Sequence, residues 1–165
     1  MKIDHTDIMP DHNLEAEQSV LGAIMLDNQA LDKIVDDLLP EDFYRENHKT
    51  IYQAMLKLQA AGSPIDLITL CDSVKSNGKI EAVGGVSYIS SLVNSVPTTA
   101  NIVFHAKLIV EAARKRTIKG IAESIYLNEG HSEGLLKLAE SIGTTVRQDS
   151  NGGFDNIQSL VKDNF

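Results

Sequence analysis

The stretch TTANIVFHAKLIVEAARKRTIKGIAESIYL, residues 98–127, decides the fold of this chain. It contains no proline and only one glycine, Gly120, so it predicts one continuous helix. Thr98 or Thr99 is the expected N-cap, and the helix is expected to end near Leu127. About 28 helical residues span roughly 42 Å, whereas a head of about 100 residues has a radius of gyration near 13 Å. We therefore expect the helix to project beyond the head.

A second amphipathic helix is predicted after the turn at residues 128–131. It begins at Ser132, and its apolar residues recur with helical period as far as Val146. The two helices would form an antiparallel αα-hairpin. An isolated hairpin buries too little apolar surface to be stable, so a second copy or another protein is expected to cover it, and self-association is predicted. The expected interface residues are Ile118, Ile121, Ile125, Leu135, Leu138 and Ile142.

The segment before the long helix is predicted to be an all-helical head. Asn13 is the expected N-cap of a helix over residues 14–26, with acidic residues in its first turn. Asn28 is the expected N-cap of a second helix that stops before Pro40. The apolar residues of this second helix follow the spacing of one buried face and are Leu31, Ile34, Val35, Leu38 and Leu39.

Three further helices are expected in the head, with Phe43 and Tyr44 filling its core. One runs from about Asn47 to the left-handed Gly62, and its inward residues are Ile51, Met55 and Leu58. The next runs from the N-cap Asp66 to the Asn77-Gly78 turn, and its apolar residues are Leu67, Leu70, Cys71 and Val74. The last covers about residues 86–95 and is closed by Pro97, and its residues of interest are the buried Ile89, Leu92 and Val93 and the partly exposed Tyr88.

Composition and charge limit the classes of function. The 165 residues are 42% hydrophobic, which suffices for a core, and Cys71, the only cysteine, is expected to be a small core residue. No apolar run resembles a membrane span or a signal peptide, so the cytoplasm is the expected location. The net charge is −8, with 15 acidic and 7 basic residues in 1–97 and 8 of each in 98–165. This acidity argues against direct DNA binding by the segment.

A short basic cluster interrupts this pattern on the predicted long helix, and a solvated helix face is its expected role. Its residues are Arg114, Lys115, Arg116 and Lys119.

Catalytic, nucleotide-binding and metal-binding motifs are missing from the sequence. No Gly-Lys-Ser/Thr follows Gly84-Gly85, which we interpret as a turn. The adjacent acids Asp36-Asp37 and Glu41-Asp42 point in different directions and are interpreted as solvated charges. The histidines are too widely scattered for a helical metal pair, at His5, His12, His48, His105 and His131. We therefore expect no catalytic residue, cofactor or metal in this segment.

Three stretches resemble, in order and spacing, the N-terminal domain of DnaB-type replicative helicases. They are LEAEQSVLGAIMLDNQAL, LLPEDFYRENHKTIYQAML and GGVSYISSLVNSVPTTANIVFHAKLI, and the resemblance is continuous over residues 14–127. SEGLLKLAESI is similar to the family's second hairpin helix. FDNIQSLVKDNF, after a flexible joint at residues 151–153, is similar to the start of its linker helix.

The resemblance implies a helical head and a projecting hairpin that pairs between subunits of a hexameric ring. It also implies docking of a DnaG-type primase. Glu15, Tyr88 and hairpin residues around Ile118 to Ile125 match family contacts, and Glu15 and Tyr88 are the candidates for primase docking. A helicase loader is a further partner that the family allows. ATP-driven 5′ to 3′ unwinding, with ATP and Mg²⁺, belongs to a RecA-like C-terminal domain that is absent from this segment.

The expected organisation has four parts: an arm over 1–13, a head over 14–97, the long helix and hairpin over 98–149, and a linker over 150–165 that begins the helix leading to a missing ATPase domain. Two other functions are considered. A free-standing helical adaptor that binds helicase or primase is the alternative, and a stop codon after residue 165 would favour it. A small helical DNA-binding protein is disfavoured by the acidic head.

Overall fold

A computed structural model describes residues 11–94, 96 and 98–127 of the chain, with side chains as far as Ile121. Within this part every regular element is a helix, so the all-α prediction is confirmed. The elements are α1 (Leu14–Leu26), α2 (Gln29–Asp32), the 3-10 helix η2 (Pro40–Asp42), α3 (Glu46–Ala60), α4 (Leu67–Ser76), α5 (Gly85–Asn94) and α6 (Ile102–Leu127). Residues up to Thr117 form one compact unit, and a second unit begins at Ile118.

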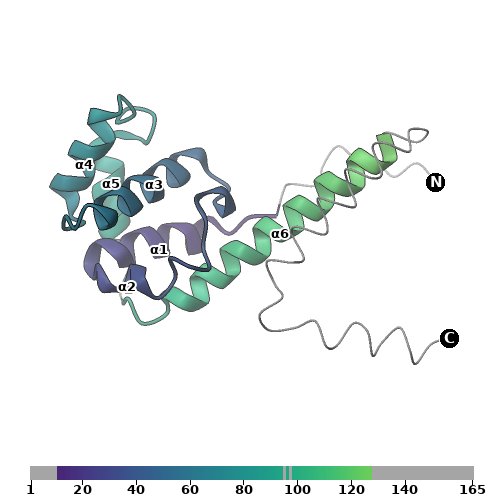
Figure 1. The fold of residues 1–165 in the computed structure, drawn as a ribbon, viewed down its shortest axis with the longest axis horizontal. Coiled ribbons are helices and arrows are strands. Elements are labelled where there is room, and N and C mark those ends of the chain that lie inside the picture. Colours follow the sequence, from purple (N-terminus) through teal and green to yellow (C-terminus); the bar gives the residue numbers. More distant parts are fainter. Residues whose placement is uncertain (1–10, 95, 97, 128–165) are drawn as a thin grey trace. The chain divides into compact units, whose positions relative to one another are not determined.

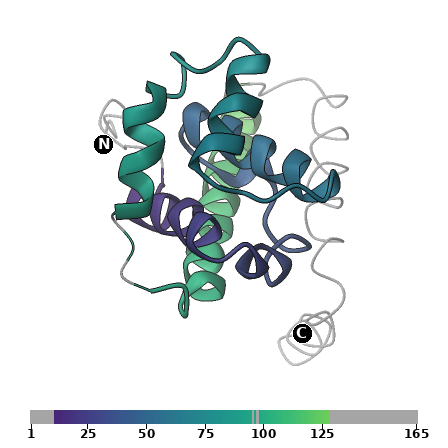
Figure 2. The same cartoon turned by 90° about the vertical axis from the view of Figure 1, so that its left-hand side faces the viewer.

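Helix α1 is the centre of the first unit. It packs against α5, α3 and α2, and Figures 1 and 2 show α5 beside α1 from two directions. Because it packs against three helices, α1 buries about half of its residues, more than a single apolar stripe would. These residues are Ala16, Glu17, Val20, Leu21, Gly22, Ala23 and Ile24.

The ends of several helices agree with the sequence prediction. The Asn13 Oδ1 accepts a hydrogen bond from the Ala16 N–H at 3.0 Å and caps α1. The Asp66 carboxylate accepts from the N–H groups of Ile68 and Thr69 and caps α4. Gly62 has a φ of 66° after α3, a backbone angle that favours glycine.

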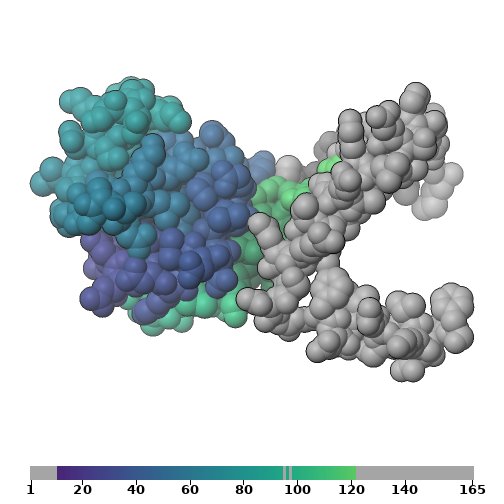
Figure 3. Space-filling model, in the orientation of Figure 1, coloured from purple at the N-terminus to yellow at the C-terminus, as the bar shows by residue number. Residues whose placement is uncertain are grey.

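In the space-filling view α4 lies at one end of the visible face, and α1 and α2 lie below it (Figure 3).

The predicted second helix of the head is wrong in its length and in one core residue. Helix α2 ends at Asp32, and residues 33–37 form turns. In these turns some backbone N–H groups donate to the carbonyl three residues earlier and others to the carbonyl four residues earlier. Leu39 is extended and 45% exposed, because a residue before proline disfavours the helical conformation. The other predicted residues keep their side chains in or against the core, and Tyr52 donates a hydrogen bond to the Leu38 carbonyl at 3.1 Å.

Tyr44 and Asn28 also differ from expectation. Phe43 is buried as predicted, but Tyr44 is 39% exposed because successive side chains of this extended segment point in opposite directions. Asn28 does not cap α2 with its side chain. Its amide donates to the carbonyls of Ile24 and Ile65 and accepts from the Ile65 N–H, each at 2.8 Å, so it joins the end of α1 to the segment before α4.

Helix α6 begins at Ile102, later than the predicted caps Thr98 and Thr99. The Thr98 hydroxyl accepts only from the nearby Ala100 N–H, and the Ile102 N–H bonds three residues back to Thr99, so this segment is a turn. The helix then continues for 26 residues to Leu127, as predicted. Four predicted apolar residues of other helices, Leu58, Leu67, Cys71 and Val93, are half-buried. Partial burial raises the pKa of the Cys71 thiol.

The second hairpin helix lies outside the described residues, so the hairpin and the projection of the long helix stay predictions. No helix in the described ranges is long and apolar enough to span a membrane.

Candidate functional site

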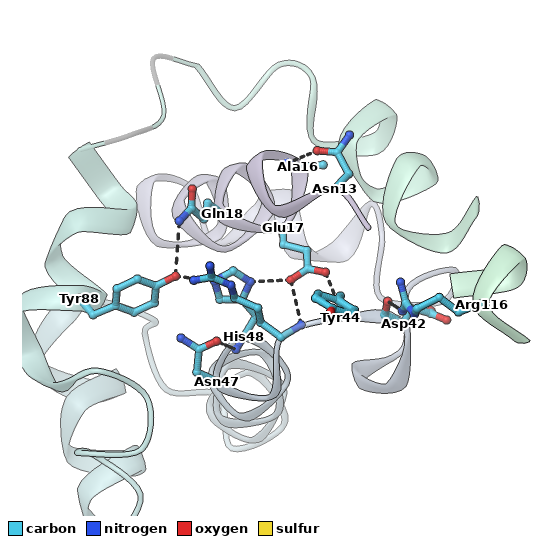
Figure 4. Close-up of polar contacts among 11 residues, drawn as sticks. Asn13, Ala16, Glu17, Gln18, Asp42, Tyr44, Asn47, His48, Tyr88 and Arg116 are labelled. Carbon is cyan, nitrogen blue, oxygen red and sulfur yellow. Dashed lines mark hydrogen bonds and ion pairs between the residues drawn. The ribbon is translucent and has the colours of Figure 1, made fainter. Parts of the chain in front are cut away.

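A connected set of polar side chains lies where α1, α3 and α5 meet (Figure 4). Glu17 on α1 is 1% exposed, and His48 on α3 is fully buried. The His48 Nδ1 lies 2.6 Å from the Glu17 Oε2, and the His48 Nε2 lies 2.5 Å from the hydroxyl of Tyr88 on α5. Three helices are thus connected through two side-chain hydrogen bonds.

Glu17 also holds the backbone that leads into α3. Arg45, at the N-cap position of α3, makes no side-chain capping bond. The Glu17 carboxylate instead accepts from the backbone N–H of Tyr44 at 2.6 Å and from that of Arg45 at 3.4 Å. A carboxylate at a helix N-terminus is stabilised by the free N–H groups and the helix dipole. Helix α1 therefore fixes the start of α3.

The polar groups of the network pair with one another. The two ring nitrogens of His48 contact the Glu17 carboxylate and the Tyr88 hydroxyl, and the hydroxyl oxygen also receives the Gln18 Nε2–H at 3.4 Å. No buried side-chain nitrogen or oxygen among the described residues lacks a partner. The network therefore satisfies the groups that it buries.

The two candidate docking residues, Glu15 and Tyr88, lie on α1 and α5, two helices that pack against each other. Glu15 is exposed in the first turn of α1, and Tyr88 is half-buried on α5. Gln18 connects them, since it lies three residues from Glu15 on the same helix face and donates to the Tyr88 hydroxyl. We name Glu15, Gln18 and Tyr88 the α1/α5 seam. The partial exposure predicted for Tyr88 is confirmed.

Gly22 sets the close approach of the two helices at this seam. A Cβ built on Gly22 would collide with the backbone carbonyl of Leu92 on α5 and with the side chain of Val96. Only glycine therefore allows α1 and α5 to pack at this distance. The role of Gly22 was not predicted from the sequence.

Arg116 on α6 anchors a second polar cluster within the first unit. Its guanidinium donates to the backbone carbonyls of Asp11 at 2.9 Å and Asp42 at 2.5 Å, and it lies 5.6 Å from the centre of the Tyr44 ring. The His12 ring stacks on Tyr44 at a centroid distance of 4.6 Å. Burial raises the pKa of the neighbouring Asp42 carboxyl, which accepts from the Leu39 N–H.

The solvated-face interpretation of the basic cluster is therefore wrong for Arg116, because the backbone carbonyls of other segments hold its side chain. Lys115, the next residue along the chain, is exposed. The solvated-charge interpretation of the acidic pairs also fails for Asp42, which is half-buried.

Two of the predicted hairpin interface residues are described. Ile118 is 64% exposed, and Ile121 is half-buried. The side chain of Ile125 lies outside the described part, and so do Leu135, Leu138 and Ile142.

The Glu17–His48 pair is the main feature that the sequence analysis missed. One signal was available, because Glu17, Leu21 and Ile24 share a helix face and His48, Ile51 and Met55 share another. A charged or polar residue in register with a buried face needs a partner, and each is the partner of the other. Among the described residues, no three His, Cys, Asp or Glu side chains lie together as metal ligands would.

Known proteins of similar sequence identify the family to which this helical domain belongs. The sequence profile described as "DnaB-like helicase N terminal domain" matches residues 9–111. The chain is 42% identical over 160 residues to "Replicative DNA helicase DnaC" of Bacillus subtilis (strain 168), and the alignment covers 94% of this chain and 35% of that relative. It is 38% identical over 158 residues to "Replicative DNA helicase DnaB" of Geobacillus stearothermophilus, where the alignment covers 93% of this chain and 35% of the relative.

Solved structures agree with these relatives. The crystal structure of the N-terminal domain of DnaB helicase from Mycobacterium tuberculosis has a TM-score of 0.77 at 31% identity, over 82% of this chain and 99% of that one. A second solved structure, described as "The Structure Of A DnaB-Like Replicative Helicase And Its Interactions With Primase", has a TM-score of 0.69 at 26% identity, over 92% of this chain and 36% of that one.

The fold and the satisfied polar network define a helical scaffold domain that presents a shaped surface. The chain belongs to the DnaB-like helicase N-terminal domain family. It spans about a third of the length of the curated relatives that it matches.

Proposed function

We propose that this chain is the assembly and primase-docking domain of a replicative DNA helicase. The observation that carries the proposal is the family match over residues 9–111, joined to a seam in which Gln18 links Glu15 and Tyr88. In this proposal residues 14–97 are the head, 98–149 the long helix and hairpin, and 150–165 a linker. ATP and Mg²⁺ are bound, and DNA is unwound 5′ to 3′, by a further domain, in the cytoplasm.

The proposed partner is the C-terminal domain of a DnaG-type primase. One similar solved structure is described by its interactions with primase, which supports a partner of this kind for the fold. On this chain the α1/α5 seam is the proposed contact, because Gln18, which shares a face of α1 with Glu15, donates to the Tyr88 hydroxyl and so links the two predicted residues. A loader protein is a further candidate partner of the assembled helicase.

Titration calorimetry with a purified primase C-terminal domain tests the docking role. We expect Glu15→Ala and Tyr88→Ala each to weaken binding at least fivefold, since the few anchor residues that carry most of an interface's binding energy each cost more than about 1 kcal/mol when truncated. Asp36→Ala is the matched control, because Asp36 is exposed but lies on neither α1 nor α5. Unchanged affinity in both seam variants, or no binding by the parent, would contradict the docking role.

Self-association through the hairpin is the second part of the proposal. Ile118 is 64% exposed on α6, and with Ile121 and Ile125 at helical spacing it predicts an apolar stripe that a second copy would cover. Ile125→Glu should weaken the dimer at least tenfold, because burying an isoleucine is worth roughly 1.5–3 kcal/mol and burying a charge is costly. Sedimentation equilibrium measures this, with Lys115→Ala as control. A dimer as tight as the parent's would remove the hairpin as the interface.

A further inference from the structure

We infer that His48, held by Glu17, is a positioning residue of the α1/α5 seam that fixes Tyr88 for binding of the partner. The inference rests on the proposed docking function. The His48 Nε2 lies 2.5 Å from the Tyr88 hydroxyl, and the two rings are nearly parallel, with an interplanar angle of 13° and centroids 5.9 Å apart. His48 is fully buried, so it cannot contact a partner directly and would affect binding through Tyr88.

His48 itself is held rigidly. Its Nδ1 is bonded to Glu17, and Glu17 is in turn bonded to two backbone N–H groups at the start of α3, those of Tyr44 and Arg45. The imidazole therefore cannot rotate without breaking a buried hydrogen bond, which is costly. Tyr88, by contrast, is half-buried and would have other side-chain rotamers available without this anchor. The anchor orders Tyr88 before a partner arrives, which lowers the entropy lost on binding.

The charge of the seam indicates the kind of partner surface that fits it. Glu15 is exposed in the first turn of α1, so the seam carries a negative charge. A partner surface with positive charge and hydrogen-bond donors fits such a seam.

A double-mutant cycle with the primase C-terminal domain tests the role of His48. His48→Asn keeps an amide N–H near Glu17 but is too short to reach Tyr88, and Tyr88→Phe removes only the hydroxyl. Each change alone should weaken binding about three- to tenfold, because coupled neighbours share interaction energies of this order. The double variant should bind as Tyr88→Phe does, within about twofold, because His48 acts through that hydroxyl. Additive losses would show a general structural role and overturn the inference.

Rescue and spectroscopy give readouts that stability alone would not change. His48→Gln can place an amide group near the Nε2 position, so it should bind primase more tightly than His48→Asn, and it replaces that variant if His48→Asn fails to fold by circular dichroism. The ¹³Cζ resonance of Tyr88 should move in His48→Asn and not in Glu15→Ala. An unmoved resonance would contradict the anchor. Absence of primase binding by the parent would instead contradict the proposed function, whatever the resonance shows.

Discussion

The Nδ1 of His48 and the Oε2 of Glu17 lie 2.6 Å apart, between side chains that are 0% and 2% exposed and 31 residues apart in the sequence. This contact joins α1 to α3 in the centre of the unit, where an unpaired polar group would be costly. Through Tyr44 and Arg45 the same carboxylate fixes the start of α3, and through His48 it reaches Tyr88 on α5. Stability and the proposed docking surface therefore depend on the same pair.

Glu17→Ala should lower the free energy of unfolding by about 3–5 kcal/mol, because it leaves a buried histidine and two backbone N–H groups without their acceptor. Urea unfolding monitored by circular dichroism measures the change. Glu15→Ala is the matched control two residues earlier on α1, where the side chain is exposed, and it should change stability by less than about 0.5 kcal/mol. Equal losses in the two variants would show that the buried network contributes nothing specific.

Gly22→Ala should lower the free energy of unfolding by about 1–3 kcal/mol, because the new methyl group meets the Leu92 backbone and forces α1 away from α5. This cost exceeds the gain of about 1 kcal/mol in helix propensity. Gly120→Ala in α6 is the opposite case, since no described atom lies within 4 Å of a Cβ there, and it should raise helix stability by about that gain. Thermal unfolding of both variants checks the pair, and a stabilised Gly22→Ala would refute the close packing.

Arg116→Ala should lower the free energy of unfolding by about 1.5–3 kcal/mol, because the guanidinium bonds the carbonyls of Asp11 and Asp42 and covers the Tyr44 ring. Lys115→Ala is the control, since Lys115 is the exposed neighbour on α6. Its effect should stay below about 0.5 kcal/mol. Denaturant midpoints of the two variants give the comparison. If they coincide, Arg116 is a solvated charge after all.

Asp66 should make a pH-dependent contribution to the stability of α4. Hydrogen bonds from Thr69 and Ile68 lower the pKa of its carboxyl below 3.8, so folding favours the ionised form. Such a group stabilises the fold above its unfolded pKa, and this contribution is lost as the pH falls through the folded pKa. The gap in urea midpoint between the parent and Asp66→Ala should therefore be larger at pH 7 than at pH 3. A gap that widens in acid would contradict this assignment.

Much of the helical architecture could be predicted because its signals are local. The Asn13 and Asp66 caps, the left-handed Gly62 and the long proline-free helix each depend on contacts within about four residues of sequence. The buried faces of α3 and α5 follow from helical period in the same way, and so does the family resemblance, which is a pattern of such residues in order.

Other features of the structure depend on tertiary packing and have no local signal in the sequence. Asn28 is a residue type that often caps helices, but here its side chain joins α1 to the segment before α4. Tyr44 follows the buried Phe43 in sequence, yet its side chain faces outward to Arg116. Glu17, His48 and Tyr88 become a network only because three helices pack together, at separations of 31 and 40 residues. The physical reason is that propensity and capping act within one helical turn, whereas the partner of a buried polar group is set by how whole helices pack.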